Sequence, residues 1–264
     1  MTKTGVEYAD YSWNPITGCF GPCGETCAYC YAVGIARRFA ARGGLRGKDC
    51  EDRGVHTLYK PGYYHDKNCQ RRVSPFPYGF DPTFHRYRLA DAAPASVKKP
   101  STIFVGDMAD MFGRWVPDEW IQAVFEACER APQHRYLFLT KNPQRLIDLR
   151  DSGLLPPGKN FWYGSTVECP ADISLADPWK RKNTFASVEP VLCNFPNGSI
   201  ALHVDWVIVG RDTSNRKDKV VPKREWIENI VKCCRLYGVP VFLKDNLRDI
   251  WAADLIQEYP EGLR

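Results

Sequence analysis

The stretch that decides the fold is TIFVGDMADMFGRWVPDEWIQAVFEACERAPQHRYLFLT, residues 102–140. It begins with a short β-branched and apolar run, Thr102–Gly106, which predicts a strand. Apolar residues then recur at helical spacing over Asp118–Arg130 and predict an amphipathic helix. Tyr136–Thr140 predicts a second strand. Strand, helix and strand in succession are typical of parallel sheets and α/β barrels.

The same alternation extends toward both ends of the chain. Further strands are predicted at Tyr8–Trp13, Phe161–Thr166, Thr184–Val188, Asp205–Gly210 and Val239–Leu243, the last at a sheet edge because it contains Pro240. Further helices are predicted at Ala32–Ala41, Pro143–Leu149, Ala171–Trp179, Lys223–Leu236 and Asp249–Tyr259. Residues 43–99 break the pattern, and we expect one long, aromatic-rich insertion after the first helix that packs over the barrel mouth.

A cysteine-rich loop follows the first predicted strand. It contains Cys23-Gly-Glu-Thr-Cys27-Ala-Tyr-Cys30, with Cys19 four positions upstream. Three thiolates on one short loop can hold three irons of a 4Fe–4S cluster and leave the fourth iron open for a ligand. Spacing favours Cys23, Cys27 and Cys30 as these three. The alternatives are a structural zinc site closed by all four cysteines, and unligated thiols.

Composition limits the class of protein. The chain has 264 residues, a usual length for one α/β barrel, so we expect a single domain over residues 1–264. Apolar residues make up 44% of it, but no run is long enough to span a membrane. Eleven cysteines without an apolar signal segment predict reduced thiols or metal ligands in a cytoplasmic protein. The formal charge of +5 permits nucleic-acid contact without requiring it.

Polar residues follow nearly every predicted strand. In an α/β barrel these strand ends share one face with the active site, so we expect them to converge there together with the cysteine loop. The competing interpretation is that each such residue merely caps the next helix. The candidates named here are Gly106, Asp107, Lys141, Ser165, Glu168, Glu189, Gly210 and Lys244.

The chain resembles the radical S-adenosylmethionine (SAM) superfamily, through the spacing of Cys23, Cys27 and Cys30 with an aromatic residue before the last. Within it, the chain is similar to a family of phages and bacteria that shares Trp13-Asn-Pro-Ile-Thr-Gly-Cys19 and Cys27-Ala-Tyr-Cys-Tyr-Ala32. Further matching motifs are Phe80–Arg88, Phe104–Phe112, Leu139–Pro143, Ser187–Pro190 and Asp205–Gly210.

The resemblance implies a fold and a set of cofactors. The fold is α/β, a partial (β/α)6 TIM-like barrel, and the cofactors are a 4Fe–4S cluster and SAM. The family motif favours Cys19 over Cys23 as the third ligand, and Cys27 and Cys30 are ligands in either case. Spore photoproduct lyase, a DNA-repair enzyme, is a more distant analogue.

The resemblance also implies roles for single residues. Gly106 and Asp107 match the place where the superfamily holds the amino group of SAM, and Tyr29 would cover the cluster or touch the adenine. By the same resemblance, Ser165 and Glu168 would hold the ribose of SAM, and Gly210 would contact its adenine. Lys141 or Lys244 would pair with the carboxylate of SAM, and Glu189 would also contact the cofactor. Lys141 is in addition a candidate catalytic residue.

The sequence therefore predicts a radical SAM enzyme that receives electrons from a donor such as flavodoxin or ferredoxin. The alternatives are a metal-stapled nucleic-acid-binding module without catalysis, and a cluster protein for electron transfer only. Basic residues and the aromatic insertion suggest a nucleic acid or nucleotide as substrate, although aromatic residues are mainly packing residues. Cys169, or less favourably Cys193, is a candidate hydrogen donor. The competing interpretation is that both are buried small hydrophobic residues, as free cysteines usually are.

Overall fold

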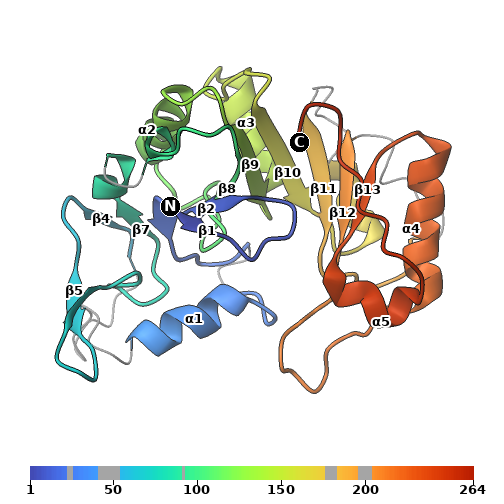
Figure 1. Cartoon of the computed structure of the whole chain (residues 1–264), viewed down its shortest axis with the longest axis horizontal. Helices are drawn as coiled ribbons and strands as arrows, with labels where there is room; N and C mark the ends of the chain where they lie inside the picture. The colour runs from blue at the N-terminus through green and yellow to red at the C-terminus, as the bar shows by residue number, and fades with distance from the viewer. Residues whose placement is uncertain (23–25, 41–53, 91–92, 176–182, 196–203) are drawn as a thin grey trace. The chain divides into compact units, whose positions relative to one another are not determined.

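The computed structural model describes residues 1–22, 26–40, 54–90, 93–175, 183–195 and 204–264 (Figure 1). The chain forms two compact units, residues 1–134 and 135–264. Both units combine helices with β-strands. The pairings described in the second unit are parallel and those of the first unit are mixed, so the predicted α/β class is confirmed. Within the described ranges no helix has the length and apolar character that crossing a membrane requires.

The first unit is built around three paired strands. β8 (Thr102–Val105) lies parallel to β2 (Tyr11–Trp13), and β1 (Thr2–Lys3) pairs antiparallel with β2. All four residues of β8 are buried, as its continuous apolar pattern predicts. The described part of this unit includes the helices α1 (Tyr31–Ala40) and α2 (Asp118–Glu129), and both agree with the sequence prediction to within one residue.

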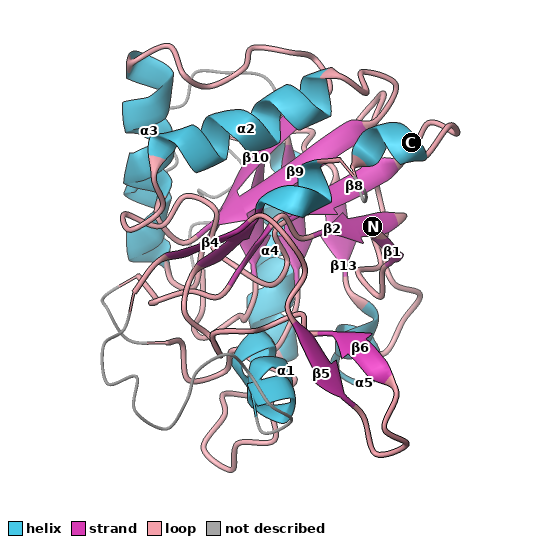
Figure 2. Ribbon diagram, turned by 90° about the vertical axis from the view of Figure 1, so that its left-hand side faces the viewer, coloured by secondary structure: helices cyan, strands magenta, loops and turns pink. Residues whose placement is uncertain are grey.

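The predicted insertion contains short strands where we expected no regular pattern. β7 (Thr83–His85) pairs antiparallel with β3 (Ile16–Thr17) and parallel with β4 (His56–Leu58). A separate hairpin is formed by β5 (Tyr63–His65) and β6 (Arg71–Val73), and Figure 2 shows it beside α1. Two 3₁₀ helices follow, η1 (Arg86–Leu89) and η2 (Pro94–Ser96). Strands of two or three residues are too short to show a recognisable alternation in the sequence.

The second unit contains five parallel strands whose order in the sheet is their order in the chain. They are β9 (Arg135–Thr140), β10 (Phe161–Thr166), β11 (Thr184–Val188), β12 (Trp206–Val209) and β13 (Val241–Leu243). α3 (Pro143–Asp151) follows β9, and α4 (Arg224–Leu236) connects β12 to β13. β13 is the last strand of the sheet, which confirms the edge position expected from Pro240.

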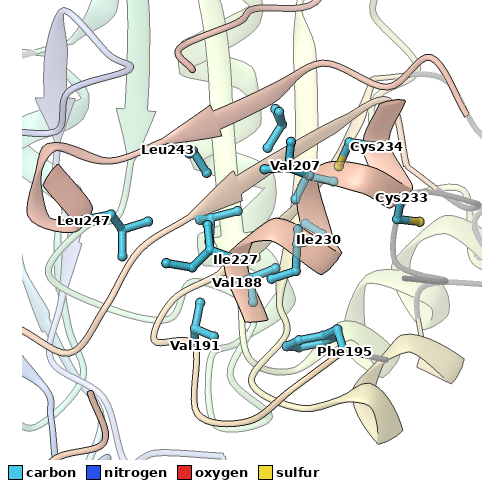
Figure 3. Close-up of a cluster of buried hydrophobic side chains, with 14 of the residues drawn as sticks. Val188, Val191, Phe195, Val207, Ile227, Ile230, Cys233, Cys234, Leu243 and Leu247 are labelled. Carbon is cyan, nitrogen blue, oxygen red and sulfur yellow. The ribbon is translucent and has the colours of Figure 1, made fainter. Parts of the chain in front are cut away.

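α4 covers one face of this sheet. Ile227 and Ile230 of α4 are fully buried against valines of three neighbouring strands, as Figure 3 shows for Val188 and Val207. Because side chains alternate along a strand, the register assigns Ala186, Val188 and Val209 to this same face. Burial of such a layer of branched apolar side chains stabilises the sheet.

Two predicted helices differ from the structure. Residues 249–259 are not one helix, because α5 (Arg248–Trp251) ends at Ala252 in the left-handed conformation. The chain then runs alongside β13, where the Leu243 amide donates to Ile256 and the Glu258 amide donates to Val241. Unpaired backbone groups at a sheet edge attract such a partner. The prediction at 171–179 corresponds to a 3₁₀ helix, η3 (Pro170–Leu175), and its remainder lies outside the described residues.

Candidate functional site

Three of the four loop cysteines are described in the first unit. Cys19, Cys27 and Cys30 are free thiols of intermediate exposure. Burial and the neighbouring Asp110 carboxylate raise the pKa of Cys19 to about 12, and Cys27 and Cys30 contribute in the same direction. The three sulfur atoms are therefore close enough for their charges to act on one another. Cys23, the fourth candidate, lies outside the described residues.

Backbone hydrogen bonds hold Cys19 in place. Its amide donates to the Phe80 carbonyl at 3.0 Å, and the Gly18 amide donates to the Met108 carbonyl at 2.9 Å. Gly18 has φ +85°, and a Cβ atom there would lie 2.3 Å from the Asp81 carbonyl oxygen. Only glycine fits this approach, so Gly18 lets the chain pass directly against the Asp81 backbone just before Cys19.

Cys27 and Cys30 form a turn that leads directly into α1. The Cys30 amide donates to the Cys27 carbonyl at 3.0 Å, and the helix starts at the next residue, Tyr31. A helix N-terminus presents unpaired amides and a partial positive charge, which favour anionic ligands such as thiolates. Tyr29, predicted to cover the cluster or the adenine, is half-buried within this turn.

Asp107 lies at the end of β8, in the loop that follows Gly106. Its carboxylate accepts hydrogen bonds from Ser12 Oγ at 2.9 Å and from Asn14 Nδ2. The Asp107 carbonyl accepts a hydrogen bond from the Tyr31 hydroxyl at 2.6 Å, which links this loop to the start of α1. The structure thus brings the Gly106–Asp107 loop and the cysteine turn together, as the sequence predicts for the first unit.

A buried polar network supports this arrangement. Arg88 donates to the Asn14 carbonyl at 2.6 Å, and the Asn14 side-chain oxygen accepts from the Met108 amide. His85 is fully buried, with Thr17 Oγ1 2.8 Å from its Nε2 atom. Burial, and to a smaller extent Arg88, lowers the pKa of His85 to about 2, so its ring is neutral in the folded protein. A neutral, hydrogen-bonded histidine adds no charge to this network.

Three cysteine thiolates on one loop are suitable donors for a 4Fe–4S cluster and, with a fourth ligand, for a zinc ion. Among the described residues, no three His, Cys, Asp or Glu side chains already form a group that could hold one metal ion. In a 4Fe–4S cluster each cysteine binds a different iron, so its three thiolates need not meet at one point. Binding would remove the thiol protons, because a coordinating thiol is deprotonated.

In the second unit, two lysine–glutamate ion pairs lie where the strands end. Lys141 after β9 pairs with Glu168 after β10, and Lys244 after β13 pairs with Glu189 after β11, the latter at 2.5 Å. Gly210 lies between the last two, since a Cβ atom on it would be 3.0 Å from both Glu189 Oε1 and Lys244 Cδ. Five predicted residues of this unit therefore lie at one edge of the sheet: four form two ion pairs, and Gly210 lies beside one of them.

The two strand-end serines of this unit lie on opposite faces of the sheet. Ser165 pairs in register with Ala186, and so lies on the face that α4 covers. Ser187 belongs to the other face, is 1% exposed, and its hydroxyl has no hydrogen-bond partner in the structure. Ser165, the predicted ribose contact, thus lies on the helix side of the sheet.

Cys169 and Cys193 lie close to Glu168. The Cys169 thiol is 3.5 Å from Asp172 Oδ2, and the Cys193 thiol is 3.8 Å from the Glu168 carbonyl oxygen. Partial burial raises the pKa of the Cys193 thiol, and the nearby charges of Cys169 and Asp172 raise it further. The sulfur atoms of Cys169 and Cys193 are therefore neighbours. Asp172 also accepts hydrogen bonds from the Glu168 and Cys169 amides, which holds this turn.

A model of the family described as "Protein of unknown function (DUF5131)" matches residues 3–253. The chain belongs to this family. Neither the search of the curated proteins nor that of the solved structures returned a match. The region that matches the DUF5131 model extends over both units and includes the cysteine loop and the lysine–glutamate pairs.

Sequence reasoning did not assign a role to several residues that organise the site of this DUF5131 chain. Ser12 and Asn14 contact Asp107, and Asp110 lies near Cys19. Asn14 and Asp110 each lie within a recognised motif, whereas Ser12 had no signal beyond its predicted strand. Ser187 also lies within a recognised motif, but its burial and its face of the sheet depend on strand register. Strand register is a tertiary property, so the local sequence pattern could not identify Ser187 as a buried residue of that face.

Proposed function

We propose that this protein is a radical SAM enzyme, in which Cys19, Cys27 and Cys30 bind a 4Fe–4S cluster. The observation that carries the proposal is the grouping of these three thiols on one loop, close enough for Cys27 and Cys30 to act on the pKa of Cys19. Three cysteines leave one iron of such a cluster without a protein ligand. The proposed fold around it is the partial (β/α)6 barrel.

When bound, the cluster would supply the electron that cleaves SAM, after reduction by flavodoxin or ferredoxin. The residues of the chain would position and shield it. Asp107, held by Ser12 and Asn14, presents a fixed loop after β8 for the amino group of the cofactor. Tyr31 ties that loop to α1, so the cysteine turn and the loop would move as one piece.

A direct experiment is anaerobic reconstitution with iron and sulfide, followed by reduction and incubation with SAM. We expect about four irons per chain and release of 5′-deoxyadenosine. Uptake of one zinc ion without iron would contradict the proposal and favour a metal-stapled binding module. A redox-active cluster that leaves SAM intact would indicate electron transfer alone.

We further propose a nucleic acid or nucleotide as the substrate, with Cys169 as the hydrogen donor that ends the reaction. The S–H bond of Cys169 would break as a C–H bond forms on a substrate carbon radical. The unpaired electron left on sulfur would be removed by one electron from the external donor and one proton. The proton would come from solvent. Asp172, which accepts a hydrogen bond from this thiol at 3.5 Å, would orient its S–H bond, and Cys193 is the neighbouring thiol.

Replacing Cys169 with alanine is therefore expected to stall turnover or divert the product, while iron content and SAM cleavage stay unchanged. The measurement is product analysis by mass spectrometry with candidate oligonucleotides, alongside the 5′-deoxyadenosine yield. Cys69→Ala is the control, because Cys69 is an exposed thiol of the other unit. Normal product formation by the Cys169→Ala protein would assign this cysteine to packing.

A further inference from the structure

The hairpin of β5 and β6 presents an exposed side that the cysteine site does not use. Its register pairs Tyr63 with Val73, Tyr64 with Arg72, and His65 with Arg71. Because side chains alternate along a strand, Tyr63, His65, Arg71 and Val73 share one face, and all four are exposed. We call these four residues the outer face of the hairpin.

The opposite face is anchored to the protein. Tyr64 lies 6.2 Å from Phe39 of α1, ring centroid to ring centroid, and is only partly exposed. Arg72 on that same face donates to Asp66 at 3.0 Å, and the Asp66 carboxylate also accepts from the Asn68 and Gln70 amides in the turn. The hairpin is thus held from one side, and its outer face is available for a partner.

The outer face combines positive charge with flat side chains. The Arg71 guanidinium lies 3.6 Å from the centre of the Tyr63 ring, as expected for diagonal neighbours in a hairpin. Residues 59–73 carry four positive charges, from Lys60, Lys67, Arg71 and Arg72, and one negative charge, from Asp66. Asp66 is occupied within the hairpin, so the charge that faces solvent is positive. Tyr59, 72% exposed, precedes β5 and adds a further ring.

We propose that the outer face of this hairpin binds single-stranded nucleic acid, which deepens the proposed function by giving its substrate class a contact surface. Lysine and arginine side chains would pair with phosphates, and the Tyr63 ring with its stacked Arg71 would support an unpaired base. Aromatic rings and guanidinium planes are the two platforms on which proteins stack splayed bases. Duplex DNA hides its base faces, so the single strand is the better occupant.

Charge alone would also suit an anionic membrane, but the side chains favour nucleic acid. The exposed rings are tyrosines and one histidine, which carry polar groups at their tips, and the only aliphatic side chain on the outer face is Val73. A membrane-binding surface typically presents tryptophan, phenylalanine or leucine for insertion. Stacking and phosphate contact need no such insertion.

The test is a fluorescence-anisotropy titration of the full chain, prepared without iron, with a labelled single-stranded oligonucleotide at several salt concentrations. We expect salt-dependent binding and a loss of about tenfold or more in affinity for Tyr63→Ala, since stacking of a base is worth about 1–3 kcal/mol. Arg71→Gln is expected to weaken binding. It should also reduce the slope of log affinity against log salt concentration by about 0.7, the value for one phosphate contact in a single strand.

Lys99→Gln is the matched control, because it removes one exposed positive charge of the same unit outside the hairpin. Equal losses for Lys99→Gln and Arg71→Gln would overturn the proposal, as would absence of binding at low salt or preferential binding to vesicles rich in phosphatidylserine. This measurement needs no cluster. Failure of SAM cleavage in the reconstituted protein would therefore contradict the proposed enzyme and leave the binding result unaffected.

Discussion

Replacing Cys30 with alanine is expected to abolish both iron retention and SAM cleavage. Cys30 ends the turn that leads into α1, and no other described thiol except Cys27 lies in that turn. A cluster that loses one of three protein ligands also loses the geometry that leaves a single open iron. Iron content after anaerobic reconstitution and desalting, together with the yield of 5′-deoxyadenosine, measures the effect. Cys27→Ala is expected to give the same result.

Two comparisons sharpen this prediction. Cys69→Ala removes an exposed thiol outside the loop, and we expect it to retain about four irons per chain. Cys19→Ala and Cys23→Ala separate the two candidates for the third ligand, and we expect the loss with Cys19→Ala. A Cys30→Ala protein that binds iron and cleaves SAM as well as the Cys69→Ala protein would refute the cluster assignment.

Replacing Gly18 with alanine is expected to destabilise the first unit strongly. At φ +85° an L-residue costs about 1–2 kcal/mol, and its Cβ atom would lie 2.3 Å from the Asp81 carbonyl oxygen. That oxygen belongs to the backbone, so the clash can be relieved only by moving one chain segment away from the other, at about 1–3 kcal/mol more. Together these give an expected loss of about 2–5 kcal/mol in the free energy of unfolding, measured by urea denaturation.

Gly79 offers a matched control for this substitution. It also has a positive φ, +64°, but nothing lies within 4 Å of a Cβ atom placed on it. Gly79→Ala should therefore lose only the conformational part, about 1–2 kcal/mol. If the two variants unfold at the same urea concentration with equal slopes, the contact of Gly18 with Asp81 has no energetic role. Because Cys19 follows directly, we also expect Gly18→Ala to lower iron retention.

The strands and helices of residues 102–243 follow closely from local pattern. β8, β9, β10, α2 and α4 each match their predicted bounds to within one residue, because buried strands and amphipathic helices have clear periods in hydrophobicity. The cysteine loop and the polar strand ends were also recognisable, since their residue types and spacing indicate their chemistry. The roles of Cys19, Cys27, Cys30 and the SAM-binding residues stay predictions.

Where pattern failed, the cause was a partner distant in the sequence. Residues 256–258 have the composition of a helix, yet they extend along β13 because the free edge of that strand offers hydrogen bonds. The strands at 56–58 and 83–85 form through pairing with each other and with Ile16–Thr17. No local signal of three residues can specify such pairing, because the energy comes from the ladder of hydrogen bonds.

The sequence by itself determined the α/β class, the order of most elements and the residue types of the candidate site. Only the tertiary structure decided which of these residues meet. It joined Lys141 to Glu168 and Lys244 to Glu189, assigned Ser165 and Ser187 to opposite faces of the sheet, and brought Asp107 to Asn14. Each of these contacts depends on strand register and chain crossing. A one-residue change in register would reverse the face of every side chain, and local composition does not record that choice.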